Sequence, residues 1–426
     1  MSEYTSATKC IQSGYQPANG ELRTLPLYQG TTYKYDSGDE LAKLFDLESA
    51  GHMYTRISNP TVEYVEQKIA DLEGGVAAMC TSSGQAATLI AILNICSSGQ
   101  NFVCMSNLYG GTTNLFSVTL KKMGIEARFV NDAMSDEEIQ SYFDENTRLV
   151  FGETIANPSL AVLDISRFAR LAHSNGVPLM IDNTFATPIL CRPLQYGADV
   201  VIHSSSKYMD GHATVVGGVI VDGGSFDWEK DNRYPELSES DPSYHGVTYT
   251  TQFKEAAFIV KARVQLMRDL GSTYQPFSAF ILNLGLETLA LRMQRHSENA
   301  LKVAQFLSGN EKVSWITYPG LSSDKNYPLA QQYLEKGQAS GVVSFGVKGG
   351  RKSAMKFMNA LKLASIVVHV ADARTSVLHP ASTTHRQLSD EQLEEAGISS
   401  DFIRLSVGIE DAADILADID QALQSL

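Results

Sequence analysis

A lysine directly follows an apolar run near the middle of the chain. Residues 200–203 read Val-Val-Ile-His, and three serines separate them from Lys207. Ligands of α/β sheets bind at the carboxyl ends of strands, so a reactive group would be presented there. A lysine beside apolar neighbours loses its proton more easily and can act as a nucleophile or form a Schiff base. The alternative is a surface lysine that merely follows a strand, and the segment taken alone favours that alternative.

A carboxylate ends a second apolar run, because residues 177–184 read Val-Pro-Leu-Met-Ile-Asp-Asn-Thr. Asp182 would then lie at the same edge of the sheet as Lys207. A buried carboxylate is costly unless it is paired, and a protonated pyridine nitrogen is a good partner. The alternative is that Asp182 caps a helix or forms a turn.

Three further segments offer groups for a ligand. Residues 80–87 open an apolar helix with small polar residues and a glycine, so its free N–H groups could bind a phosphate, although an ordinary serine-capped helix has the same pattern. Tyr109, beside a glycine pair, could stack on a planar ring or pack in the core. Arg404 lies in an apolar run, where a bound carboxylate or an acidic residue of the protein would satisfy its guanidinium.

Taken together, these groups match the requirements of pyridoxal 5′-phosphate (PLP): a Schiff-base lysine, a partner for the pyridine nitrogen, a phosphate site and a stacking tyrosine. The chain has no GxGxxG after a strand and no GxxxxGK[ST], GxSxG or HExxH motif, which weakens dinucleotide, P-loop, serine-hydrolase and zinc-protease readings. His379 and His385 are six residues apart, but a pair without a nearby carboxylate is more often structural, so we expect no metal.

The elements that must position these groups alternate apolar strands with amphipathic segments. A helix is expected at 61–72, and strands are expected at 101–105, 125–130, 148–153, 178–182, 200–203 and 215–221. This alternation predicts an α/β fold with a mostly parallel sheet. A long helical stretch at 275–308 leads to a smaller C-terminal α/β unit with strands at 313–317, 341–347 and 402–407.

These elements suggest a division of the chain into an arm and two domains. Gly and Pro interrupt any period in residues 1–60, which predicts an irregular N-terminal arm. The cofactor domain is expected at 61–275 and the C-terminal domain at 276–426. Residues 223–250 lose periodicity and read as an inserted loop, and long loops in compact domains tend to be functional.

Composition sets the broad class. The 426 residues carry 34 Lys and Arg against 48 Asp and Glu, and the resulting net charge of −14 argues against nucleic-acid binding. The five cysteines show no CxxC spacing and sit mostly among apolar neighbours, which favours buried free thiols in a reducing compartment. No signal pattern and no apolar stretch of membrane-spanning length occurs, so a cytoplasmic protein without a membrane partner is expected.

Three motifs carry a resemblance that runs over nearly the full chain. The segments at residues 54–61 (Tyr-Thr-Arg-Ile-Ser-Asn-Pro-Thr), 206–208 (Ser-Lys-Tyr) and 404–410 (Arg-Leu-Ser-Val-Gly-Ile-Glu) resemble the Cys/Met-metabolism family of PLP enzymes, of fold type I. The resemblance implies that Lys207 binds the cofactor covalently, that Asp182 pairs with its pyridine nitrogen, and that Tyr109 stacks on the ring and moves protons.

The resemblance also implies the surroundings of the cofactor and the substrate. The phosphate would be held by Ser83, Gly84, Gln85, Ser204 and Ser206. Tyr54 and Arg56 would complete the phosphate site of a neighbouring subunit, so the arm would assemble a homotetramer with active sites shared across a dimer interface. Asn157 would lie near the cofactor's 3′ oxygen. Arg404 would bind the substrate's α-carboxylate, with Thr375, Tyr54 and Asn157 beside it.

Positions around the substrate favour one branch of the family. Methionine γ-lyases carry a cysteine where this chain has Gly111, and cystathionine lyases and synthases carry an acidic residue where it has Arg374. With residues 382–388 and the insertion at 223–250, the chain resembles O-acetylhomoserine sulfhydrylases. His369 and Ala371 depart from that pattern, because an asparagine and a glycine are common there.

The reaction implied is a γ-replacement that converts O-acetyl-L-homoserine and sulfide to L-homocysteine and acetate, and a thiol such as methanethiol is an alternative sulfur donor. A methionine or cystathionine γ-lyase, a β-lyase and a cystathionine γ-synthase are the alternatives within the family, and a sulfur-carrier protein is an alternative donor. An inactive scaffold is the alternative from another class. The resemblance leaves open the choice between acetyl and succinyl esters and any activity on O-acetylserine.

Overall fold

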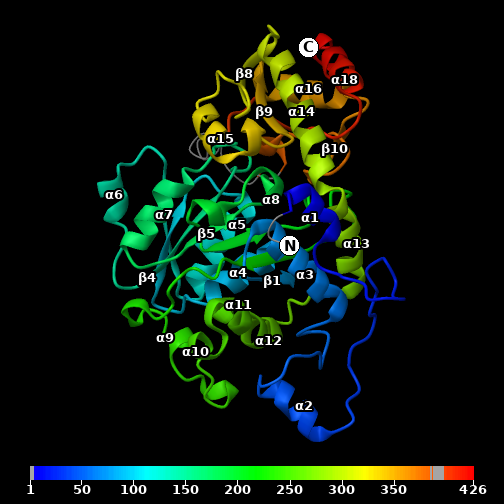
Figure 1. The fold of residues 1–426 in the computed structure, drawn as a ribbon. Helices are drawn as coiled ribbons and strands as arrows, with labels where there is room; N and C mark the ends of the chain where they lie inside the picture. Colours follow the sequence, from blue (N-terminus) through cyan, green and yellow to red (C-terminus); the bar gives the residue numbers. More distant parts are fainter. Residues whose placement is uncertain (1–3, 384–385, 387–397) are drawn as a thin grey trace.

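A computed structural model describes residues 4–383, 386 and 398–426 (Figure 1). A seven-stranded sheet lies at its centre, in the order β1-β7-β6-β5-β4-β2-β3. Its strands are β1 Ala77–Thr81, β2 Asn101–Met105, β3 Glu126–Val130, β4 Thr147–Glu153, β5 Leu179–Asp182, β6 Val200–His203 and β7 Gly218–Asp222. Only β7 runs antiparallel to its neighbours, which confirms the expected α/β fold with a mostly parallel sheet.

A second sheet of five strands forms the C-terminal part, in the order β10-β11-β12-β9-β8. Its strands are β8 Val313–Thr317, β9 Val342–Val347, β10 Ser365–Ile366, β11 Ser376–Leu378 and β12 Phe402–Ser406. All of its pairs are antiparallel except the pair of β10 and β11. The strands expected at 313–317, 341–347 and 402–407 are therefore present.

Helices cover both sheets. Those around the larger sheet are α3 Pro60–Glu73, α4 Gly84–Leu93, α5 Gly110–Asn114, α6 Asp136–Gln140, α7 Ile165–Ser174, α8 Thr187–Leu190, α11 Ala257–Lys261 and α12 Arg268–Leu270. Helices α13 Pro276–Glu287 and α14 Leu289–Ser308 lead to the smaller sheet, which carries α15 Tyr327–Tyr333, α16 Gly350–Ala360 and α18 Ala412–Gln424. Within the described residues, no helix is both long and apolar enough to span a membrane.

Local signals explain where the helices near the site begin and end. The Asn59 side chain accepts a hydrogen bond from the N–H of Thr61 at 3.0 Å, and Pro60 takes the first helical position of α3. The same helix ends at Gly74, whose φ of 83° is accessible to glycine at little cost. The Ser83 hydroxyl caps α4 by accepting from the N–H of Ala86 at 3.1 Å.

The structure corrects four details of the sequence interpretation. The arm is not wholly irregular, because it contains α1 Ser6–Gln12 and α2 Gly38–Phe45. Cys80 and Thr81 end strand β1 instead of opening a helix, which starts only at Gly84. The long helical stretch is interrupted at Thr288, between α13 and α14. The segment 223–250 contains α9 Pro235–Ser238 and the first two residues of α10 Tyr249–Phe253.

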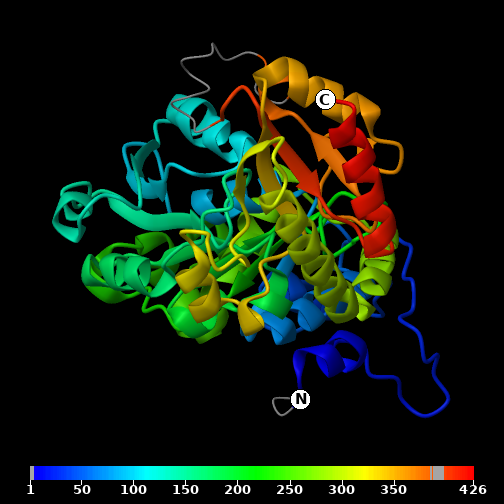
Figure 2. The same cartoon turned by 90° about the horizontal axis from the view of Figure 1, so that it is seen from above.

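The arm and the 223–250 segment pack differently. The arm runs along the outside of the body in both views and projects from it at α2 in Figure 1 (Figures 1 and 2). The 223–250 segment is instead anchored by buried aromatic side chains, including Trp228 and Tyr234, and Trp228 stacks on Phe258 of α11 with ring centroids 5.2 Å apart. The boundaries at residues 60 and 275 stay a prediction.

Candidate active site

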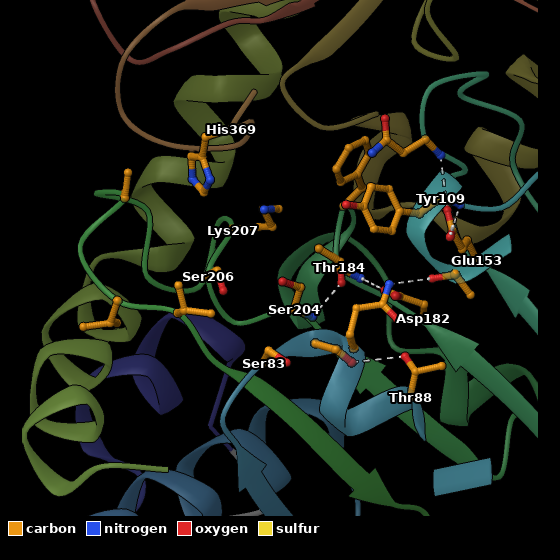
Figure 3. Close-up of a pocket in the computed structure, with 18 of the residues that line it drawn as sticks. Ser83, Thr88, Tyr109, Glu153, Asp182, Thr184, Ser204, Ser206, Lys207 and His369 are labelled. Atoms are coloured by element: carbon orange, nitrogen blue, oxygen red, sulfur yellow. Dashed lines mark hydrogen bonds between the residues drawn. The ribbon is translucent and has the colours of Figure 1, made fainter. Parts of the chain in front are cut away.

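A cavity of about 460 Å³ opens at the carboxyl ends of the central strands (Figure 3). Its walls come from the ends of β4 and β5, the loop after β6, the start of α4, the loop after β2 and the segment between β10 and β11. The lining includes these residues singled out from the sequence: Ser83, Gly84, Gln85, Tyr109, Asn157, Asp182, Ser204, Ser206, Lys207 and His369. The sheet edge predicted to present Lys207 and Asp182 is therefore the edge that carries the cavity.

Hydrogen bonds from α14 and from Gly341 hold the loop that carries Lys207. The carbonyl oxygen of Tyr208 accepts from Arg292 Nη1 of α14 at 2.6 Å, and the Tyr208 hydroxyl accepts from the N–H of Gly341 at 3.0 Å. Burial and the nearby positive charge of Arg404 lower the pKa of Lys207, and Asp182 opposes them. A lysine held in this way is closer to its neutral, nucleophilic form than an exposed one.

Asp182 shares its end of the sheet with a second carboxyl group, that of Glu153. The two residues are in register on β5 and β4, so their side chains lie on the same face of the sheet. Asp182 Oδ1 accepts from the N–H of Thr184 at 2.9 Å. Burial raises the pKa of both carboxyl groups, and the charge of Asp182 raises that of Glu153 further. A cationic ligand group beside Asp182 would relieve this cost.

Glu153 was given no role from the sequence, but its carboxyl group holds two neighbouring loops by hydrogen bonds. Its Oε1 accepts from the N–H of Tyr109 at 2.7 Å and its Oε2 from the N–H of Asn157 at 3.2 Å. An acidic residue at the end of a buried strand was the available signal, the same one that identified Asp182. Glu153 therefore positions both the aromatic ring and the amide that face the cavity.

The start of α4 faces the loop that carries Lys207. A Cβ atom on Gly84 would lie 2.7 Å from the Ser204 Cβ atom, so only glycine allows this approach. The Ser206 hydroxyl is held by Gly217, whose N–H donates to it at 2.9 Å. The first N–H groups of a helix have no intrahelical partner, and together with the hydroxyls they form a site suited to a phosphate.

Arg404 lies behind Asn157 and is only 7% exposed. Its Nη1 donates to Asn157 Oδ1 and its Nη2 to the carbonyl oxygen of Val368, each at 3.1 Å. Its Nε is buried without a partner in the part of the chain that the structure describes. Burial lowers the pKa of this guanidinium to about 10. A buried guanidinium held by amide oxygens, and by no acidic residue among those described, fits a carboxylate ligand.

Four predicted site residues do not line this cavity: Arg404, which lies behind Asn157, and Tyr54, Arg56 and Thr375. Tyr54 is 44% exposed, and Arg56 lies over its ring at 5.4 Å and donates to the Arg268 carbonyl oxygen at 2.6 Å. Thr375 is buried, and its hydroxyl bonds Glu410 Oε2 at 2.8 Å. The roles given to these residues stay predictions.

Two other sequence features also lie away from the cavity. Arg374, the residue that distinguishes this chain from cystathionine lyases and synthases, is exposed and does not line the cavity. The 223–250 segment contributes none of the described lining residues. For the residues at 4–383, 386 and 398–426, no cluster of three or more metal-ligating side chains is found, and His385 of the histidine pair lies outside them.

The site therefore defines an α/β protein built for covalent chemistry on a phosphorylated aromatic cofactor. Lys207, a helix start with serine hydroxyls and a buried carboxyl group fit PLP, and the buried Arg404 fits an amino-acid substrate. The family model described as Cys/Met metabolism PLP-dependent enzyme matches residues 7–424, and the chain belongs to this family. This match confirms the resemblance and the dependence on PLP.

Individual relatives are similar over almost their whole length. The chain is 46% identical to an O-acetyl-L-homoserine sulfhydrylase of Leptospira meyeri, covering 98% of this chain and 96% of that one. It is also 46% identical to a homocysteine synthase of Schizosaccharomyces pombe, covering 97% of each. An O-acetylhomoserine (thiol)-lyase structure from Campylobacter jejuni superposes with a TM-score of 0.95 at 36% identity, covers 99% of this chain and 100% of that one, and contains a pyridoxyl-lysine phosphate.

Proposed function

We propose that this enzyme replaces the acetoxy group of O-acetyl-L-homoserine with sulfide and releases L-homocysteine and acetate. The observation that carries the proposal is that Lys207 lies in a cavity whose wall at Asn157 is bonded by a buried Arg404, and this guanidinium has no acidic partner among the described residues. This arrangement suits an amino acid held by its carboxylate beside a lysine. The names of the relatives in Leptospira meyeri and Schizosaccharomyces pombe support this particular reaction.

Each cavity residue would contribute a distinct function. PLP, when bound, withdraws electrons from the substrate's α-carbon and so acidifies the protons beside it. Lys207, once the substrate has replaced it, would remove the α-proton and move a β-proton. Asp182 would hold the cofactor's pyridine nitrogen in its protonated form. Tyr109 would stack on the cofactor ring and assist proton movement.

The binding groups divide between the cofactor and the substrate. Ser83, Gly84, Gln85, Ser204 and Ser206 would hold the phosphate, and Asn157 would contact the cofactor's 3′ oxygen. Arg404 would hold the α-carboxylate, with Thr375, Tyr54 and Asn157 beside it. Acetate then departs from Cγ as a stable anion, which is why an acylated homoserine suits the site better than free homoserine.

The structure around Gly111 disfavours a methionine γ-lyase. A Cβ atom at this position would lie 2.5 Å from Tyr109 Cε1 and 2.9 Å from Gln85 Nε2. A cysteine there would therefore displace the Tyr109 ring from its present place. This contact supports the γ-replacement reading over the lyase that carries such a cysteine.

The arm supports a role in assembly. Tyr54 and Arg56 lie on the outside of the subunit, so we propose that they reach the phosphate site of a neighbouring subunit in a homotetramer. The five cysteines are free and buried, which supports a reducing, cytoplasmic location.

The test is a product assay with the purified, PLP-loaded enzyme. O-acetyl-L-homoserine and sulfide together should yield homocysteine and acetate in equal amounts. O-succinyl-L-homoserine serves as the matched ester with a larger acyl group. Acetate release with no homocysteine, in the presence of sulfide, would contradict the proposal.

A further inference from the structure

His369 is a titratable cavity residue that has no part in the steps above. His369 lies between β10 and β11, and its ring points into the cavity (Figure 3). The ring is on the same side of the cavity as Lys207, and Asp182 is on the opposite side. Its Nε2 atom is buried and makes no hydrogen bond to any described residue. Buried polar atoms in folded proteins nearly always have a partner, so this nitrogen requires an explanation.

Four charged groups act on the imidazole. Burial and the charges of Lys207 and Arg404 lower the pKa of His369, and Asp372 and Asp210 oppose them. The net effect lowers the pKa, so the ring is neutral near pH 7 and carries one lone pair. Nε2 lies 4.0 Å from Asp372 Oδ2, which is beyond hydrogen-bond distance, so Asp372 does not occupy this nitrogen.

The segment that carries His369 is tied to the substrate side of the site. The Val368 carbonyl oxygen accepts from Arg404 Nη2 at 3.1 Å, and the N–H of Ala371 donates to Ser406 Oγ at 2.8 Å. Ala371 has a φ of 68°, a backbone conformation that alanine adopts only at a cost. These bonds fix the imidazole relative to the guanidinium proposed to hold the α-carboxylate.

We infer that His369 is a catalytic residue that accepts the proton of the incoming sulfur nucleophile. This inference rests on the proposed function. A substrate anchored at Arg404, with its α- and β-carbons beside Lys207, would extend its Cγ past the lysine to the side where the imidazole lies.

The chemistry balances without a further reactant. Acetate has left with the electron pair of the Cγ–O bond, and Lys207 has taken a proton from Cβ, so a double bond joins Cβ and Cγ. The S–H bond then breaks, its proton passes to the unprotonated ring nitrogen of His369, and the sulfur electron pair forms the S–Cγ bond. The π pair moves to Cβ, where Lys207 returns its proton. His369 afterwards loses its proton to solvent.

The inference distinguishes sulfur donors by their acidity. The ionised form of a thiol is the nucleophile. Hydrogen sulfide is largely ionised at about pH 8, whereas an alkanethiol such as methanethiol, like the cysteine thiol, is mostly protonated below its higher pKa. A proton acceptor in the cavity therefore matters more for methanethiol than for sulfide.

The experiment compares these two donors in the PLP-loaded enzyme and in His369→Asn. Rates with O-acetyl-L-homoserine are measured at about pH 8, and cofactor absorbance verifies that the variant is folded and loaded. We expect the methanethiol rate to fall about 100-fold, at the low end of general-base effects, and the sulfide rate to fall less than about 10-fold. Ala371→Gly is the matched control, since it relaxes the same turn and keeps the imidazole, and its ratio of the two rates should equal that of the parent.

Equal losses with both donors in His369→Asn would show that His369 only shapes the cavity, and would overturn the inference while leaving the proposed function intact. If that variant does not retain the cofactor, His369→Gln replaces it, with the same two outcomes. A parent enzyme that makes no homocysteine from sulfide would instead overturn the proposed function, and the inference with it.

Discussion

Truncation of Arg404 tests how the substrate is held. Arg404→Ala removes a guanidinium that is 7% exposed and bonded to Asn157 Oδ1 and the Val368 carbonyl oxygen. Removing one partner of a buried, hydrogen-bonded charge pair costs about 2–5 kcal/mol. At about 1.4 kcal/mol per factor of ten, kcat/KM for O-acetyl-L-homoserine should fall roughly 30-fold to several thousand-fold.

The loss should appear mainly in KM, because the carboxylate anchor is used in both the ground state and the transition state. Steady-state kinetics over a wide range of substrate concentration separates KM from kcat. Arg404→Lys is the matched variant, since it keeps the positive charge and loses the two-pronged geometry, and it should fall between the parent and Arg404→Ala. Cofactor absorbance should be unchanged in both variants. An unchanged KM in Arg404→Ala would show that the substrate carboxylate binds elsewhere.

Three further predictions concern the cofactor site and the core. Lys207→Ala should abolish both turnover and the absorbance of the lysine-bound cofactor, and covalent cofactor that persists in this variant would refute the assignment. Gly84→Ala should weaken PLP binding by about tenfold in a titration of the cofactor-free enzyme, because its Cβ would lie 2.7 Å from the Ser204 Cβ atom; an unchanged affinity would argue that the phosphate lies elsewhere. Burial lowers the pKa of His296 from 6.5 to about 4. Between these two pH values the unfolded chain binds a proton at His296 and the folded chain does not. The free energy of unfolding should therefore fall by up to about 3 kcal/mol as the pH drops from about 6.5 to about 4. Denaturant unfolding of the parent and of His296→Gln over this range checks it, and an equal pH dependence in both would contradict it.

The central strands were predictable because buried parallel strands read as continuous apolar runs. Strands β2, β4, β5 and β6 all begin and end within one residue of the expected positions. Strand β1 was missed, since Ala77–Thr81 reads Ala-Ala-Met-Cys-Thr and runs into the residues that cap α4. Its strand conformation comes from pairing with β7, some 140 residues later in the chain, and no local pattern encodes that pairing.

The site residues likewise divide into those that a local sequence pattern predicts and those that depend on contacts with distant parts of the chain. Lys207 and Asp182 follow or end apolar runs, so their place at one sheet edge could be inferred from parallel pairing. The role of Glu153 could not be inferred, because its partners are backbone N–H groups of Tyr109 and Asn157 in two separate loops. His369 could not be inferred either, because it follows Val216, the preceding lining residue in the sequence, by about 150 residues.

The most direct test of the central claim, γ-replacement rather than elimination, is one set of incubations analysed by mass spectrometry. The PLP-loaded enzyme is given O-acetyl-L-homoserine with and without sulfide and, separately, methionine or cystathionine alone. The account predicts homocysteine only where O-acetyl-L-homoserine and sulfide are both present. Rapid release of 2-oxobutanoate and ammonia from methionine or cystathionine alone would contradict it and identify the enzyme as a lyase.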